Sequence, residues 1–189
     1  MSKLSNLVTS VRDYLTPGYS KNLWITYCGA LTAIYLLLSG FNISITALIE
    51  IRFGYFALAA AGMIGGPLMG ITVGVLGDVL KMLIIPGQGS FFFGFTFCYA
   101  LMGMFYGLLF YKSRITPIRA IAGALVEFVI ATLGITTCLS ILYGTPWKAT
   151  FISRLPKCLI MILVSAFLMF VIIRALSTAL NKAQLLQQH

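Results

Sequence analysis

Residues 86–95 of this chain, PGQGSFFFGF, separate two long apolar runs. The segment begins with a proline and two glycines, which favour a turn, and continues into three consecutive phenylalanines. A turn of this kind can present backbone N–H groups and flat aromatic faces at one membrane surface. It is therefore predicted to join two membrane helices and to suit a ligand that carries an aromatic ring.

The composition places the whole chain in a bilayer. Of its 189 residues, 60% are hydrophobic and only 9% are charged, and the mean hydropathy is +1.00. Such a chain cannot hide its apolar surface in one water-soluble core. Arg12 and Asp13 interrupt the N-terminal region where a signal peptide would need a continuous apolar segment, so the first helix is expected to be retained.

Apolar runs long enough to cross a bilayer predict an all-α integral membrane protein with a six-transmembrane-helix bundle. A Gly-Gly-Pro turn at residues 65–67 joins the second and third helices tightly. The predicted spans are about 23–41, 52–64, 68–85, 91–111, 116–142 and 149–180. The domain boundaries follow: a cytoplasmic segment at 1–22, one membrane domain at 23–181 and a cytoplasmic tail at 182–189.

The basic residues set the orientation. If six spans alternate, one face carries Lys3, Arg12, Lys21, Lys112, Arg114, Arg119, Arg174 and Lys182, whereas the opposite loops at 41–50, 86–90 and 143–147 contain no Lys or Arg. The positive-inside bias then places both termini in the cytoplasm of a prokaryotic cell, with the chain multi-pass in the plasma membrane and surrounded by lipid. Because the basic residues are scattered at span edges, the net charge of +9 does not indicate nucleic-acid binding.

Several kinds of enzyme are excluded by what the sequence lacks. The one histidine is the last residue, His189, so neither a histidine metal centre nor a Ser-His pair can form inside the bundle. There is no GxxxxGK[ST] phosphate loop, and the four cysteines form no CxxC motif. No catalysis, metal or cofactor is expected, and the cysteines are interpreted as packing residues.

Three charged residues within spans need an explanation. Asp78 lies within one helical turn of Lys81, so the two side chains either form an ion pair or Asp78 holds polar atoms of a ligand. Glu127 lies near the middle of the fifth span, where a carboxylate is costly unless it is protonated or paired. A partner within the bundle is therefore expected for Glu127.

Cationic and aromatic residues gather at the side opposite the termini. Guanidinium and ammonium groups suit carboxylates, and aromatic rings stack on planar heterocycles, so this mouth predicts an aromatic anion as ligand. The alternative for the phenylalanines is a belt that faces lipid. The mouth is expected to contain Arg52, Phe53, Tyr55, Lys81, Ser90, Phe91, Phe92, Phe93, Phe95, Tyr143, Trp147, Arg154 and Lys157.

A family resemblance runs through the same residues. The ordered series IRFGYFALAAAGMIGGPLMGITVGVLGDVL (51–80), PGQGSFFFGFTFCYALMGMFYGLLFYK (86–112) and ILYGTPW (141–147), followed by a basic last helix, resembles the folate-family S-component of energy-coupling factor (ECF) transporters. The resemblance implies a subunit that captures its vitamin from outside. Its partners would be a transmembrane coupling subunit and two ATP-binding-cassette ATPases.

The resemblance also implies roles for single residues. Gly29 and Ala33 hold the small-residue spacing with which the first helix of the family packs on the coupling subunit. Arg52 would pair with the polar edge of folate, and Phe91, Phe92 and Tyr143 would enclose the pterin ring. Arg154 or Lys157 would bind the glutamate carboxylates.

Three alternatives stay open at this point. The ligand is folate or another vitamin, such as pantothenate, riboflavin or a pyridoxine-like compound. A protein of another class would be a stand-alone secondary transporter in which protons pass through Glu127 and Asp78. A third alternative is a membrane assembly factor without a small ligand.

Overall fold

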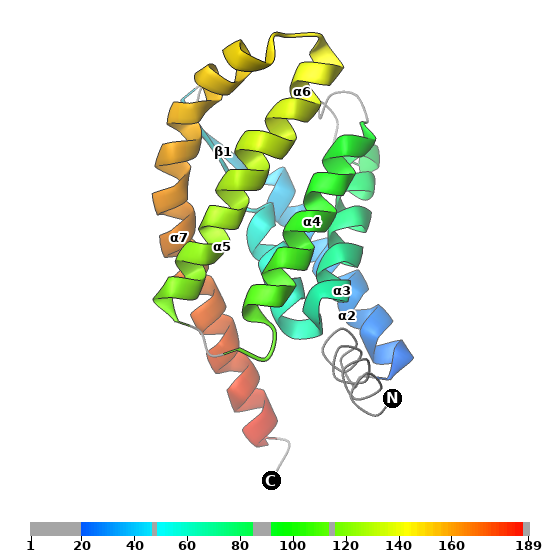
Figure 1. Ribbon diagram of the computed structural model, residues 1–189. Helices are drawn as coiled ribbons and strands as arrows, with labels where there is room; N and C mark the ends of the chain where they lie inside the picture. Colours follow the sequence, from blue (N-terminus) through cyan, green and yellow to red (C-terminus); the bar gives the residue numbers. More distant parts are fainter. Residues whose placement is uncertain (1–19, 47–48, 85–91, 114–115, 187–189) are drawn as a thin grey trace, which may run out of the picture.

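The computed structural model describes residues 20–46, 49–84, 92–113 and 116–186, and the described part is a bundle of long apolar helices (Figure 1). In hydrocarbon every backbone polar group needs an internal partner, which helices supply. The helices are α2 (Lys21–Gly40), α3 (Gly54–Ile84), α4 (Phe93–Phe110), α5 (Pro117–Val129), η1 (Ile130–Ile135), α6 (Thr136–Tyr143) and α7 (Trp147–Leu186). Within this part, five helical stretches are long and apolar enough to cross a membrane.

Helix α3 is folded back on itself at Gly66. Gly54 and Gly77 both pack against the ring of Tyr35, whereas in a straight helix residues 23 positions apart would be separated by about 35 Å. The reversal occurs at Gly66, whose φ of 75° and ψ of −171° suit only glycine, and Pro67 starts the second arm. The predicted tight join at residues 65–67 is thus confirmed, and Figure 1 shows the two arms side by side.

Small residues let α3 and α4 approach closely. A Cβ atom added at Gly70 would collide with the backbone of Gly103, and one added at Gly103 would collide with the backbone of Gly70. Gly74 faces the backbone of Tyr99 in the same way. Lipid tails are as apolar as the helix surfaces, so the hydrophobic effect does not drive helices together in a membrane. Close packing of this kind contributes the attraction instead.

The other half of the bundle pairs α5, η1 and α6 with α7. The first three form one continuous rod, in which η1 is a π-helix inserted between two α-helical segments. Helix α7 has 40 residues, with Pro156 inside it, and is about 60 Å long at 1.5 Å per residue. It packs against α5, and the two helices diverge above this contact (Figure 1).

A two-stranded antiparallel hairpin connects α2 to α3. Strand β1 (Asn42–Thr46) pairs with β2 (Ile49–Arg52), and Asn42 lies opposite Arg52. The bundle itself is helical, as predicted, but the sequence analysis treated residues 41–50 as a plain loop and missed the strands. Arg52 consequently ends a strand instead of beginning a helix, and α3 starts at Gly54.

The side chains on the outside of the bundle are apolar. Leu37, Ile118, Leu163 and Phe167 are each 66–75% exposed, which a water-soluble helix bundle would avoid but lipid favours. Inside, the largest fully buried side chains include Tyr35, Tyr106 and Phe110. All four cysteines are free and buried, which agrees with the predicted packing role.

Candidate functional site

Two adjoining cavities share Ile135 and Arg154 in their lining. The first, here called the mouth cavity, lies near the connection between α6 and α7 and has a volume of about 600 Å³ with its opening included. Its lining consists of Asp78, Lys81, Met82, Phe95, Tyr99, Ile135, Leu139, Leu142, Tyr143 and Arg154. It therefore combines one acid and two bases with three aromatic rings.

The charged wall of the mouth cavity comes from the second arm of α3. Asp78 is buried, and its Oδ2 accepts a hydrogen bond of 2.7 Å from the Thr96 hydroxyl on α4. Lys81, also buried, lies one turn further on and interacts electrostatically with Asp78. This contact supports the ion-pair alternative for Asp78, while both side chains still line the cavity.

The aromatic wall comes from α4 and α6. Phe95 packs edge-on against Phe92, with ring centroids 5.9 Å apart, and Tyr99 packs edge-on against Tyr35 at 6.4 Å. Tyr143 is 62% exposed at the end of α6, so it forms the rim. Such rings can stack on a planar heterocycle, as the sequence analysis predicted for Phe95 and Tyr143.

Arg154 on α7 lines both cavities. Its Nη1 donates a hydrogen bond of 3.4 Å to the hydroxyl of Thr136, which holds the guanidinium beside the start of α6. A guanidinium is always charged and presents its donors in a fixed fork that matches a carboxylate. Arg154 therefore places a positive charge where the two cavities meet.

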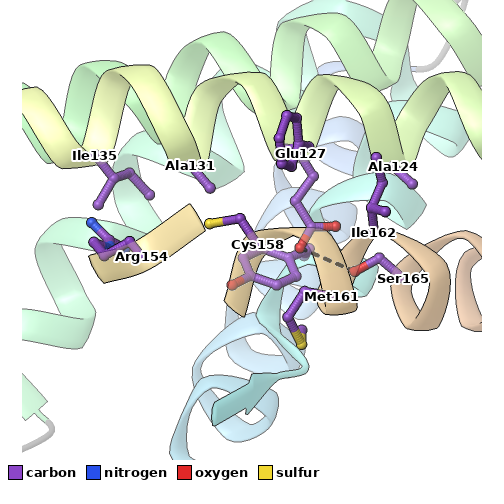
Figure 2. Close-up of a pocket in the computed structure, with 11 residues that line it drawn as sticks. Ala124, Glu127, Ala131, Ile135, Arg154, Cys158, Met161, Ile162 and Ser165 are labelled. Atoms are coloured by element: carbon purple, nitrogen blue, oxygen red, sulfur yellow. Dashed lines mark hydrogen bonds between the residues drawn. The ribbon is translucent and has the colours of Figure 1, made fainter. Parts of the chain in front are cut away.

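The second, inner cavity lies between the α5–η1 rod and α7 (Figure 2) and has a volume of about 540 Å³ with its opening included. Its lining consists of Tyr55, Ala124, Glu127, Phe128, Ala131, Ile135, Arg154, Cys158, Met161, Ile162 and Ser165. Glu127 Oε1 accepts a hydrogen bond of 3.2 Å from the Ser165 hydroxyl. Ser165 is thus the bundle partner that was predicted for Glu127.

Comparison with known proteins identifies the fold family. A family model described as "ECF transporter, substrate-specific component" matches residues 24–173, well over half of the chain. The chain belongs to this family. It is therefore an S-component, the substrate-binding part of a transporter rather than an enzyme, and a multi-pass membrane protein. Among the residues described here, no group of three His, Cys, Asp or Glu side chains is placed to hold a metal ion.

Two relatives of this S-component carry functional names. The "Folate transporter FolT" of Clostridium novyi (strain NT) is 35% identical over 126 residues, which is 66% of this chain and 73% of the relative. A solved structure described as "Crystal structure of FolT bound with folic acid" superimposes with a TM-score of 0.71 and 28% identity. That match covers 82% of this chain and 94% of the other.

The structure of the S-component brings about half of the predicted binding residues together. Tyr55, Asp78, Lys81, Phe95, Tyr143 and Arg154 line one or both cavities. Phe53 and Phe92 are partly buried against the core. Ser90 and Phe91, and the side chains of Arg52 and Lys157, lie outside the described part of the chain, so their predicted roles stay predictions.

Trp147 occupies a different place from the cavity-lining residues. It is 40% exposed, stacks on Phe151 with ring centroids 4.9 Å apart, and donates a hydrogen bond of 3.1 Å from Nε1 to Thr137. It therefore caps the connection between α6 and α7. Phe93, which the sequence analysis also placed at the mouth, is 74% exposed and suits the lipid belt.

Some residues of the site were missed by the sequence analysis. Thr96, Tyr99, Thr136 and Ser165 supply hydrogen bonds or cavity lining. Ser165 shares one face of α7 with Arg154 and Cys158 at spacings of four and seven, but this pattern does not name Glu127 as its partner. Thr96 and Asp78 also lie on different helices, so the sequence does not show their contact.

Proposed function

We propose that this S-component binds folate in the mouth and inner cavities and supplies it to an ECF importer. The observation that carries the proposal is Arg154, a cation shared by two adjoining cavities with Lys81 and aromatic walls close by. The relative named as a folate transporter and the matching fold of FolT with folic acid support the same ligand.

The ligand's chemistry fits the lining. Folate has a flat heterocycle, a benzoyl ring and carboxylates, so it needs both stacking surfaces and cations. Arg154 and Lys81 suit the carboxylates. Tyr55 and Phe128 in the inner cavity, and Phe95, Tyr99 and Tyr143 in the mouth cavity, offer aromatic surface to the rings.

The orientation in the membrane follows from charge. Lys21, Lys112, Arg119 and Arg174 lie at the end of the bundle where α2 begins and α7 ends, which is the lower end in Figure 1. The mouth cavity lies toward the opposite end, where α6 and α7 are joined. By the positive-inside bias, both termini are cytoplasmic, the chain crosses six times and the mouth faces outward.

Transport requires partners, because the chain has no phosphate loop of its own. Membership of the family supports a transmembrane coupling subunit and two ATP-binding-cassette ATPases as these partners. Gly29 and Ala33 are both exposed on α2, and a Cβ atom added at Gly29 would meet nothing within 4 Å. This open face suits the close approach of a second helix.

The test is a ligand titration of the purified subunit in detergent. Calorimetry with folate, pantothenate, riboflavin and pyridoxine should show saturable 1:1 binding of folate and at least 100-fold weaker binding of the other three. Tight binding of another vitamin without folate binding would reassign the substrate. Absence of binding by all four compounds would remove the capture function.

A further inference from the structure

The carboxyl group of Glu127 is only half satisfied inside the bundle. The residue is 6% exposed, and Oε1 accepts the hydrogen bond from Ser165. Oε2 is fully buried and has no hydrogen-bond partner among the described residues. Leaving a buried polar oxygen unsatisfied is expensive, more so at membrane depth. A purely structural Glu–Ser pair does not account for this second oxygen.

A second unsatisfied group lies in the same region. The hydroxyl of Tyr106 on α4 is fully buried, also without a hydrogen-bond partner in the described part of the chain. It interacts electrostatically with Glu127 and Tyr55, so the three side chains lie near one another. Glu127 and Tyr55 both line the inner cavity. Tyr55 and Glu127 thus add polar atoms to the lining of this cavity, whereas Tyr106 is not among its lining residues.

The other end of the inner cavity carries a cation, Arg154. Arg154 and Ser165 lie on one face of α7, and 11 residues of helix separate them by about 16 Å. Figure 2 shows them on opposite sides of the view, with Cys158 and Met161 between them. The cavity thus offers a cation at one end, an apolar middle and a carboxylate at the other.

We propose that Glu127 is a specificity-determining residue, which accepts hydrogen bonds from the N–H edge of the ligand's heterocycle at the deep end of the inner cavity. The inference rests on the proposed function and deepens it by orienting the ligand. The heterocycle lies beside Glu127 and Ser165, and the anionic end lies beside Arg154.

The chemistry of the heterocycle matches this end of the cavity. A pterin carries a 2-amino group next to a ring N–H, so it presents two adjacent donors in one plane. A carboxylate oxygen has two lone pairs, and the Ser165 bond uses one of the four acceptor positions of Glu127. Phe128 and Met161 provide apolar surface beside the acceptor. Riboflavin and pantothenate lack this paired donor edge.

The decisive variant is Glu127→Gln. The glutamine Oε1 can keep the bond from Ser165, which turns the new amide NH₂ into the cavity at the position of Oε2. The new amide N–H groups would then face the N–H groups of the pterin. Folate should bind about 10- to 100-fold more weakly, which corresponds to the free energy of a hydrogen bond to a charged group. The tail fragment 4-aminobenzoylglutamate, which lacks the pterin, should bind both proteins with affinities within twofold.

The matched control is Thr132→Val. Thr132 is 3% exposed, its hydroxyl has no hydrogen-bond partner among the described residues, and it lies outside the cavity lining. This variant should keep the folate affinity of the wild type. If Glu127→Gln does not purify as a folded protein, Ser165→Ala replaces it, with an expected three- to tenfold loss for folate and none for the tail fragment.

The outcomes separate the two proposals. Equal folate affinity in the wild type and Glu127→Gln overturns the role of Glu127 but leaves folate capture intact. An equal loss for folate and the tail fragment also overturns it, because the effect would then not involve the pterin. Wild-type protein that binds neither compound contradicts the proposed function itself.

Discussion

At the scale of the residue, charge at the junction of the cavities dominates the site. Arg154 is held by Thr136 and faces both cavities, whereas Lys81 faces the mouth cavity and is drawn to Asp78. The guanidinium of Arg154 presents a planar fork of donors that matches a carboxylate, whereas the Lys81 ammonium is a point charge. Arg154 should therefore contribute more to carboxylate binding than Lys81.

Replacing Arg154 by glutamine should weaken folate binding by about 10- to 100-fold, because a charge-assisted contact in a largely buried site is lost. Isothermal titration of the purified subunit measures the change. Arg174→Gln is the control, since Arg174 is exposed on the same helix and lies over the ring of Phe170. Unchanged affinity in Arg154→Gln would show that the ligand's carboxylates bind elsewhere.

At the scale of the element, glycine contacts determine how the helices pair. Gly70 and Gly103 meet backbone to backbone, and Gly66 provides the reversal that brings the second arm of α3 alongside α4. This pairing positions Asp78 against Thr96, so the charged wall of the mouth cavity depends on it. Packing far from the ligand therefore fixes the geometry of the site.

Substituting Gly103 by alanine should destabilise the subunit by about 1–3 kcal/mol, because the new methyl group collides with the Gly70 backbone. Thermal unfolding in detergent, followed by circular dichroism, reports the loss as a lower Tm. Gly29→Ala is the matched control, since its Cβ meets nothing within 4 Å. It should be neutral or slightly stabilising. A Gly103→Ala variant with the wild-type Tm would contradict the close contact of α3 and α4.

Sequence patterns predicted the elements better than their contacts. Long apolar runs located the helices, and the Gly-Gly-Pro turn located the reversal in α3, because both signals are local. The β-hairpin was missed since residues 42–52 are too few and too mixed to show a clear alternation. The Glu127–Ser165 bond joins residues 38 positions apart on different helices, so only the packed structure could name that partner.

At the scale of the whole molecule, the ligand site and the proposed partner surface are separate. Gly29 and Ala33 lie exposed on α2, while the cavities lie between α3, α4, α5, α6 and α7 with no lining residue from α2. Ligand capture by the isolated subunit and assembly with the coupling subunit should therefore be separable by mutation.

The double variant Gly29→Leu with Ala33→Leu should abolish co-purification with the coupling subunit and ATP-dependent folate uptake, because bulky side chains prevent close helix approach. Folate affinity of the isolated subunit should stay within twofold of the wild type. Ala175→Leu, at an equally exposed small residue of α7, is the control and should assemble normally. Normal assembly of the double variant would place the partner on another face.

Helix α7 has one further consequence. The last span is predicted to end near residue 180, but the helix continues to Leu186, which adds about 9 Å beyond the apolar stretch. Figure 1 shows this end projecting past the rest of the bundle. A rotation of the subunit would therefore move the tip of this helix further than it moves the rest of the bundle. The test is resonance energy transfer between a fluorophore attached near Leu186 and a second fluorophore on the lipid headgroups. A change in transfer efficiency during transport would report reorientation of the subunit.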